Sequence, residues 1–142
     1  MDIRKMNEYE IDDVMNIWLN SNIEAHWFID KKYWIKNFEF VSSAIAEADV
    51  YVVYIDNVMA GFMGITKGGY IAGIFVKNNF RSRGIGKSLL DMAKSMFSCL
   101  SLDVYKMNTK AIRFYKREGF KIFLENIDES SGEAEYLMKW NE

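Results

Sequence analysis

The sequence predicts one α/β (α+β) domain with a mixed, mostly antiparallel central sheet and about four helices. Short apolar segments of strand character alternate with amphipathic helical segments, and this alternation is typical of the class. The 142 residues, half of them hydrophobic, are enough for one buried core. No Pro-, Gly- or Ser-rich linker and no repeat divides the chain, so we expect a single domain over residues 1–142 with the order β-α-α-β-β-β-α-β-α-β-β.

The N-terminal part predicts a short strand at residues 2–5 and then two helices. Asn7 and Glu10 have the spacing of an N-cap and the third helical residue, which favours a helix start. The apolar residues that follow recur with helical spacing: Ile11, Val14, Met15 and Trp18. A second helix is expected to begin near Asp30. Its predicted apolar face consists of Trp34, Phe38, Val41 and Ile45.

The next part of the chain predicts a three-stranded meander. Strands at 50–55 and 58–66 are separated by Asp56-Asn57, a favourable sequence for a two-residue hairpin turn. Lys67-Gly68-Gly69 then turns the chain into a strand at 70–76. Gly73 lies inside this third strand, where glycine often marks a bulge or a close approach of two backbones.

The C-terminal half predicts two more helices and three more strands. A polar loop, residues 77–83, leads into a helix over residues 84–97. Its predicted buried stripe consists of Ile85, Leu89, Ala93 and Met96. Asn108 can cap the next helix, which would run to Glu118 and end at Gly119, because glycine is favoured just after a helix. The remaining strands are expected at 100–105, 120–127 and 134–140.

The single cysteine, Cys99, argues against a disulfide framework and favours a reduced, cytoplasmic protein. We expect Cys99 to be a buried small residue, since no histidine near it in the sequence could activate its thiol. One cysteine and one histidine cannot form a structural zinc site, and no metal is expected. The chain has no apolar stretch of about 18 residues and no signal-peptide pattern, so we expect no membrane attachment.

The net charge of −2 hides an uneven distribution. Between Lys77 and Lys121 there are 11 Lys and Arg against 3 Asp and Glu, whereas the segments on either side are acidic. A basic middle segment favours an anionic ligand. Scattered surface charge is the alternative, and the motifs inside the segment favour the ligand.

The most informative motif is Arg81-Ser82-Arg83-Gly84-Ile85-Gly86-Lys87, called the glycine loop below, between a predicted strand and a predicted helix. The first N–H groups of a helix have no intrahelical partner, and the helix dipole adds positive charge, so such a loop suits phosphate. Its arginines and lysine add full charges. Two alternatives are a glycine pair without a ligand, and a P-loop. The P-loop is disfavoured because Arg81 stands where Walker A requires glycine.

A second block further along is Asn108-x-x-Ala111-x-x-Phe114-Tyr115-x-x-x-Gly119-Phe120. With this block, Arg81-x-x-Gly84-x-Gly86 and the following Leu89-Leu90, the chain resembles the GCN5-related N-acetyltransferase (GNAT) superfamily over essentially its whole length. His26-Trp27-Phe28-Ile29 and Tyr33-Trp34 resemble the small bacterial YiaC/YjaB-like peptidyl-lysine N-acetyltransferases. The family often has proline where Asn78 stands, and Asn78-Asn79 can still form a turn.

The resemblance implies acetyl-coenzyme A as co-substrate and assigns it a binding site. Backbone groups of one strand would pair with the pantetheine arm, from Ile74, Phe75 and Val76. The amides of Arg81 to Lys87 would hold the pyrophosphate. The later block would supply further coenzyme contacts, from Asn108, Ala111 and Phe114, and Tyr115 would face the sulfur.

Acyl transfer from a thioester to an amine needs a deprotonated amine, a hydrogen-bond donor for the carbonyl oxygen and a proton for the thiolate. A backbone N–H near Phe75 or Val76 is the expected donor, and Tyr115 is the expected acid. Full transfer from a phenol to a thiolate is uphill by about 2 kcal/mol, so Tyr115 would assist a step that solvent completes. The alternative role for Tyr115 is a core aromatic beside Phe114.

The acceptor side is less defined. His26 has a suitable reference pKa for a general base, and packing in a loop is an equal alternative. Phe28, Tyr33 and Tyr70 are further candidates for acceptor contacts. Glu24, Glu47 and ordered water are less favoured bases. The acidic N-terminal part would suit a cationic amine such as a protein lysine or a polyamine.

The sequence therefore predicts an acetyl-coenzyme A-dependent N-acetyltransferase, a monomer or a homodimer. A non-catalytic coenzyme A-binding sensor of the same fold is the alternative. Nucleic-acid binding is disfavoured, because the basic residues surround the glycine loop and the Tyr115 helix and do not form one basic helix. Peptide N-termini and antibiotic amines also remain as acceptors.

Overall fold

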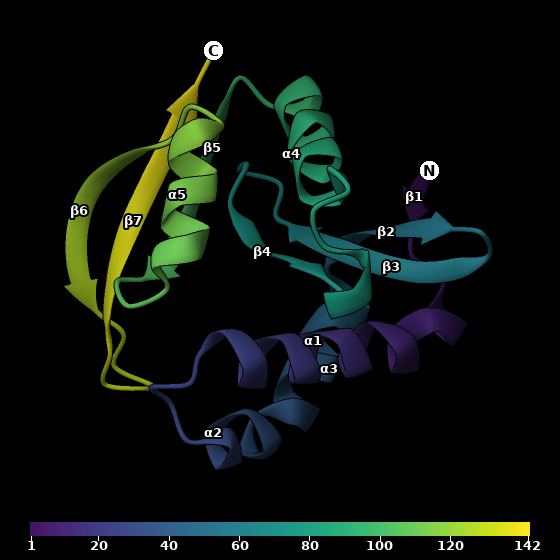
Figure 1. Cartoon of the computed structure of the whole chain (residues 1–142), viewed down its shortest axis with the longest axis horizontal. Helices are drawn as coiled ribbons and strands as arrows, with labels where there is room; N and C mark the ends of the chain where they lie inside the picture. Colours follow the sequence, from purple (N-terminus) through teal and green to yellow (C-terminus); the bar gives the residue numbers. More distant parts are fainter.

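The computed structural model describes residues 1–142 and contains seven strands, five α-helices and two short 3-10 helices (Figure 1). The strands are β1 (Asp2–Lys5), β2 (Asp49–Ile55), β3 (Val58–Ile65), β4 (Ile71–Val76), β5 (Cys99–Tyr105), β6 (Lys121–Ile127) and β7 (Ala134–Asn141). The helices are η1 (Glu8–Glu10), α1 (Ile11–Ala25), α2 (Lys31–Lys36), α3 (Phe38–Glu47), η2 (Asn78–Phe80), α4 (Ile85–Met96) and α5 (Thr109–Arg117). The predicted α/β class is confirmed.

The first sheet is antiparallel, in the order β1-β2-β3-β4. Its β2–β3 hairpin turns at Asp56 and Asn57, whose φ angles of 50° and 65° are those of a two-residue turn, as predicted. Strands β3 and β4 pair with Phe62 opposite Phe75, and their register shifts next to Gly73, as the glycine suggested. A side chain at Gly73 would collide with the Phe75 ring, which stacks on Phe62 at 5.0 Å.

The second sheet is antiparallel, in the order β5-β7-β6. One parallel bridge, Tyr70 to Ser101, links it to the first sheet. Beyond this bridge β4 and β5 separate, so the predicted mixed, mostly antiparallel sheet consists of two antiparallel sheets that one parallel bridge joins (Figure 1). The outer edge of β4 has no strand partner past the bridge.

Two cores hold the helices on opposite sides of the sheets. Helices α4 and α5 pack into one core and α1 to α3 into the other (Figure 1). In α4 the buried stripe is Ile85, Leu89, Leu90 and Ala93. The predicted burial of Met96 is wrong: it is 39% exposed, because it is the last residue of α4.

Two other expectations need correction. The second predicted helix is two helices, α2 and α3, so the chain has five α-helices where about four were expected. The break is at Asn37, whose φ of −90° and ψ of 0° depart from regular helix values. The Tyr33 carbonyl accepts from both the side-chain amide of Asn37, at 2.7 Å, and its backbone N–H, at 3.2 Å. Cys99 is exposed, because strand alternation places Leu100 on the core face of β5 and Cys99 on the other face.

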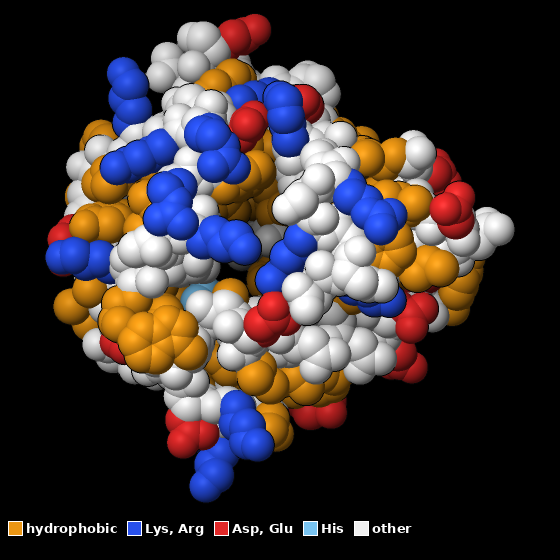
Figure 2. Space-filling view, in the orientation of Figure 1, with side chains coloured by type: hydrophobic (Ala, Val, Ile, Leu, Met, Phe, Trp, Pro, Cys, Tyr) orange, Lys and Arg blue, Asp and Glu red, His pale blue; other side chains and the backbone are white.

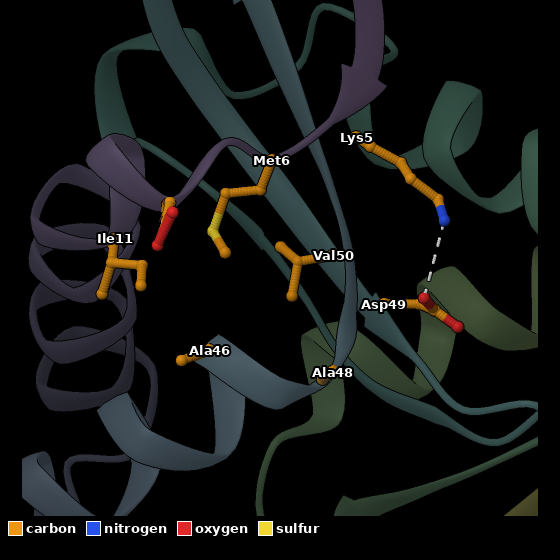
Figure 3. A pocket seen from close by; sticks show the side chains of 8 residues that line it. Lys5, Met6, Ile11, Ala46, Ala48, Asp49 and Val50 are labelled. Carbon is orange, nitrogen blue, oxygen red and sulfur yellow. Dashed lines mark ion pairs between the residues drawn. The ribbon is translucent and has the colours of Figure 1, made fainter.

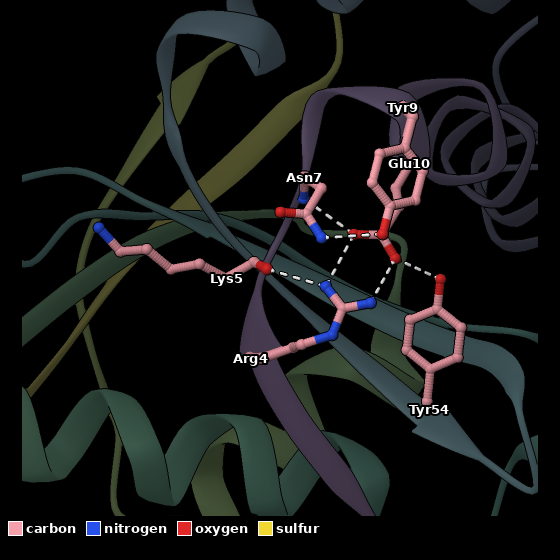
Figure 4. Close-up of polar contacts among 6 residues, drawn as sticks. All are labelled: Arg4, Lys5, Asn7, Tyr9, Glu10 and Tyr54. Atoms are coloured by element: carbon pink, nitrogen blue, oxygen red, sulfur yellow. Dashed lines mark hydrogen bonds and ion pairs between the residues drawn. The ribbon is translucent and has the colours of Figure 1, made fainter.

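An ion-pair network fixes the start of α1 to the first sheet (Figure 4). The Arg4 guanidinium donates to both carboxylate oxygens of Glu10, at 2.9 and 2.8 Å, and the Asn7 amide donates to the same carboxylate at 2.8 Å. The Tyr54 hydroxyl also donates to Glu10. The hydrogen bonds from Arg4 lower the pKa of Glu10 to about 2. The predicted pairing of Asn7 with Glu10 is confirmed.

None of the helices combines the length and apolar character that crossing a membrane requires.

Candidate functional site

The separation of β4 and β5 creates a cleft. Half-buried residues Ile74, Phe75 and Val76 lie on the part of β4 that has no strand on its β5 side. Figure 2 shows a hollow in this region of the molecule, and Lys and Arg side chains surround it. The unpaired β4 edge offers backbone donors and acceptors to an extended ligand, in the way a sheet accepts an added strand.

The glycine loop runs from η2 into α4 at one side of this cleft. Gly84 has φ +77°, and a Cβ there would meet no protein atom, so the backbone conformation and not space requires glycine. The first hydrogen bond of α4 runs from the Ser88 N–H to the Gly84 carbonyl at 3.0 Å. The N–H groups before Ser88 therefore have no partner within the helix, which is the arrangement that suits a phosphate. Ile85 contributes only its backbone, since its side chain is in the core.

The three cations of the glycine loop differ in whether they form ion pairs. Arg81 forms an ion pair with Glu24 of α1 at 2.8 Å. Lys87 contacts Asp91 at 3.2 Å and Glu118 at 3.3 Å, and the hydrogen bond to Asp91 contributes most to raising its pKa. Arg83 forms no ion pair; its guanidinium lies 5.2 Å from the centre of the Phe80 ring. Arg83 is thus the loop cation whose charge is unpaired.

Helix α5 brings the later block to the other side of the cleft. Asn108 is the N-cap, as predicted, and its side-chain oxygen accepts from the Ala111 N–H at 3.2 Å. Phe114 packs against α4 at Gly86, where an added Cβ would lie 3.4 Å from the Phe114 ring. The two halves of the family motif therefore touch through Gly86 and Phe114.

Tyr115 is 8% exposed and belongs to the core formed by α4 and α5. Its ring makes edge contacts with Phe114 at 5.1 Å and Phe120 at 5.6 Å. Burial raises the pKa of Tyr115 above its ordinary value, so the phenol stays protonated at neutral pH. Tyr115 is thus a core aromatic with a neutral hydroxyl, and its role as an acid stays a prediction.

The candidate residues of the amine-acceptor site from the N-terminal part lie around Tyr105 of β5. His26 is 9% exposed and stacks on Trp34 at 5.4 Å. It also makes edge contacts with Tyr105 of β5 at 4.9 Å and with Phe28 at 5.7 Å. Burial lowers the pKa of His26 to about 4, which makes it a poor base at neutral pH. Nearby, the Tyr33 hydroxyl donates to Ser130 at 2.7 Å.

Tyr70 lies apart from that group, at the vertex where the two sheets meet. Its hydroxyl donates to Asp103 of β5 at 2.8 Å. Burial, with a smaller effect of Asp103, raises the pKa of Tyr70. Of the remaining base candidates, Glu24 is paired with Arg81, and Glu47 is an exposed residue at the end of α3.

Sequence reasoning missed Tyr105 and the carboxylates beside it. Tyr105 contacts His26 and donates to Asp128 at 2.8 Å. Glu135 lies opposite Tyr105 in the β5–β7 pairing. Burial, together with the carboxylates of Asp103 and Asp128, raises the pKa of Glu135. No local pattern could reveal this group, because its members come from β5, β7 and the loop before β7.

A cavity of about 360 Å³ lies elsewhere, between the start of α1 and the α3–β2 junction (Figure 3). Its lining residues are Lys5, Met6, Glu8, Ile11, Ala46, Ala48, Asp49 and Val50. None of them is a predicted site residue, and two of them, Lys5 and Asp49, form an ion pair of 3.7 Å. No group of three or more His, Cys, Asp and Glu side chains is arranged to hold a metal ion.

Comparison with known proteins places this geometry in a family. Residues 46–122 match the acetyltransferase (GNAT) domain. The chain is 32% identical over 139 residues to the peptidyl-lysine N-acetyltransferase YiaC of Escherichia coli, covering 97% of this chain and 95% of YiaC. It is 32% identical over 123 residues to YjaB of Salmonella typhimurium, covering 86% of this chain and 84% of YjaB.

Solved structures show the same fold. The solution structure of apo YjaB from Escherichia coli superposes with a TM-score of 0.87 at 27% identity, covering 98% of this chain and 96% of that one. The PaiA N-acetyltransferase from Thermoplasma acidophilum, solved in complex with coenzyme A, has the same fold, with a TM-score of 0.82 at 17% identity. It covers 99% of this chain and 98% of that one.

Proposed function

Because the chain belongs to the GNAT acetyltransferase family, we propose that it transfers the acetyl group of acetyl-coenzyme A to the side-chain amine of a lysine in a protein or peptide. The observation that carries the proposal is the cleft itself. The unpaired edge of β4 adjoins the free amides at the start of α4, and Tyr115 lies on the facing helix α5.

The co-substrate would lie across the three elements. The amides at the start of α4, together with Arg83, would hold the pyrophosphate. The backbone of Ile74, Phe75 and Val76 would pair with the pantetheine arm, and one N–H of this edge would donate to the carbonyl oxygen as negative charge develops there. Asn108 would contact the arm from the start of α5.

The chemical step is direct transfer. The neutral amine nitrogen attacks the thioester carbonyl carbon, the carbon–sulfur bond breaks, the nitrogen loses one proton to solvent, and the sulfur takes one proton from solvent. Tyr115 would donate a hydrogen bond to the leaving thiolate. Its raised pKa favours this role over complete proton transfer, because a phenol that holds its proton more tightly is a weaker acid toward a thiolate.

A lysine acceptor is supported by the carboxylates beside the cleft. Glu135 and Asp103 project from the same face of the second sheet, since Glu135 is opposite Tyr105 and Asp103 is two residues before it. A raised pKa at Glu135 means that its negative charge is destabilised by burial and by Asp103 and Asp128. A cationic amine would relieve that destabilisation. The names of the YiaC and YjaB relatives point to the same acceptor.

The test is a thiol-release assay with acetyl-coenzyme A and three acceptors. These are a lysine peptide with a blocked N-terminus, a lysine-free peptide with a free N-terminus, and a polyamine. We expect the lysine peptide to react fastest, and Tyr115→Phe to lower kcat by about 100-fold while KM for acetyl-coenzyme A changes less. Coenzyme A binding without thiol release on any amine would favour the non-catalytic sensor.

Three further points belong to the proposal. Residues 1–142 form one acetyltransferase domain, supported by the cover of nearly the whole YiaC and YjaB chains. The protein is cytoplasmic, supported by its one exposed free cysteine, which a reducing compartment would preserve. It acts as a monomer or a homodimer on small or peptide substrates, without nucleic acid.

A further inference from the structure

His26 and Asn108 join two parts of the chain that are far apart in the sequence. His26 follows the last turn of α1, and Asn108 precedes the first turn of α5. The His26 Nε2 atom and the Asn108 Nδ2 atom are 3.2 Å apart. The contact therefore connects the helical layer of the first sheet to the helix that carries Tyr115.

The direction of this hydrogen bond follows from the helix cap. The Asn108 side-chain oxygen accepts from the Ala111 N–H, so the side-chain nitrogen is the atom that faces His26. An amide nitrogen can only donate. His26 Nε2 must accept, and the ring carries its proton on Nδ1. The buried Nδ1 atom then carries the proton and has no hydrogen-bond partner in the chain.

The surroundings keep the ring neutral. It is enclosed by Trp34, Phe28 and Tyr105, and no carboxylate contacts it. The titratable group that faces it is Tyr105, whose hydroxyl is directed to Asp128. Desolvation is the cause of the lowered His26 pKa, so at neutral pH the ring is available as an acceptor.

We propose that neutral His26 is a positioning residue, which holds Asn108 through Nε2 and thereby fixes the first turn of α5 and the placement of Tyr115. Asn108 has one donor on His26 and its oxygen on the helix cap. Its second N–H is then held in one direction, where it can donate to a ligand bound at the start of α5. The consequence for catalysis rests on the proposed function, in which Asn108 and Tyr115 contact the co-substrate.

The test is a double-mutant cycle with matched variants. His26→Phe keeps an aromatic ring and removes the acceptor, whereas His26→Gln keeps an acceptor of similar reach. Asn108→Ser keeps a helix cap but removes the side-chain amide that donates to His26. We expect His26→Phe to lower kcat/KM for acetyl-coenzyme A by about fivefold, as for one lost hydrogen bond, and His26→Gln to restore most of it. In the Asn108→Ser background, His26→Phe should have little further effect.

A second measurement does not depend on activity. Nitrogen-15 NMR of the wild-type ring should show the neutral tautomer with the proton on Nδ1, and His26→Phe should speed amide exchange in the first turn of α5. A proton on Nε2, or an equal effect of His26→Phe with and without Asn108, overturns the proposal. If the tautomer and the effect of His26→Phe on amide exchange are as expected but wild-type protein releases no thiol, the proposed function fails and the positioning role stands.

Discussion

Acidification should destabilise the protein through His26 before most carboxylates titrate. The pKa of this histidine falls from 6.5 in the unfolded chain to about 4 in the folded one, because burial disfavours the charged ring. Between these values the unfolded chain binds the proton and the folded chain does not. Stability contributed by the neutral ring is therefore complete above pH 6.5 and is lost as the pH falls toward about 4.

The size of the effect follows from the two pKa values. Going from about pH 7 to about pH 5, the free energy of unfolding should fall by about 2 kcal/mol on account of His26. This corresponds to a decrease of about 1 M in the urea midpoint for a protein of this size. Glu10, with a pKa lowered to about 2, loses its stabilising contribution only below its unfolded value of 4.5, so it does not interfere above about pH 5.

The assay is urea unfolding followed by tryptophan fluorescence at several pH values between about 5 and about 7. His26→Gln is the matched variant, since it keeps a hydrogen-bond acceptor but does not titrate. The variant should lose about 2 kcal/mol less than the wild type over this range. Parallel pH profiles for the two proteins would refute the assignment of a buried, neutral His26.

Three other substitutions, two of them with a control variant, test the site and the core. Gly84→Ala should destabilise the protein by about 1–2 kcal/mol in urea unfolding, because φ at Gly84 is +77°. Gly68→Ala is the control, also in open space but without a positive φ, and should be nearly neutral. Equal effects of the two substitutions would contradict the role of the backbone conformation. Arg83→Gln should raise the Kd for coenzyme A in calorimetry without lowering the melting temperature, and an unchanged Kd would exclude a phosphate contact. Leu89→Ala should cost about 2–5 kcal/mol and Met96→Ala on the same helix less than about 1 kcal/mol, since Leu89 is fully buried and Met96 is 39% exposed; similar losses would contradict the described stripe.

The elements that could be predicted from the sequence are those specified by neighbours in the chain. The turn at Asp56 and Asn57 depends on two residues that tolerate positive φ, and both adopt it. The cap at Asn108 depends on a side chain that reaches an amide three residues on, and that bond is present. Such signals lie within a few residues, so a single sequence contains them.

What could not be predicted depends on partners that are distant in the sequence. The break at Asn37 was missed because the apolar spacing continues across it, and only the local backbone conformation, with φ −90° and ψ 0°, marks the change of helix. The division into two sheets follows from the lack of pairing beyond Tyr70 and Ser101, which no periodicity records. Tyr105 could be recognised as a neighbour of His26 only from the fold, which brings β5 against the end of α1.

The number of unpaired positive charges in the glycine loop is smaller than the composition suggests. The sequence suggested three free positive charges, but Arg81 is paired with Glu24 and Lys87 with Asp91 and Glu118. In the proposed site, most of the attraction for a pyrophosphate would then come from the α4 amides, whose directions are fixed by the backbone at Gly84. An ion pair from α1 to the loop would serve mainly to hold those amides in place. Raising the ionic strength should accordingly increase the Kd for coenzyme A less than it would in a site with three unpaired cations.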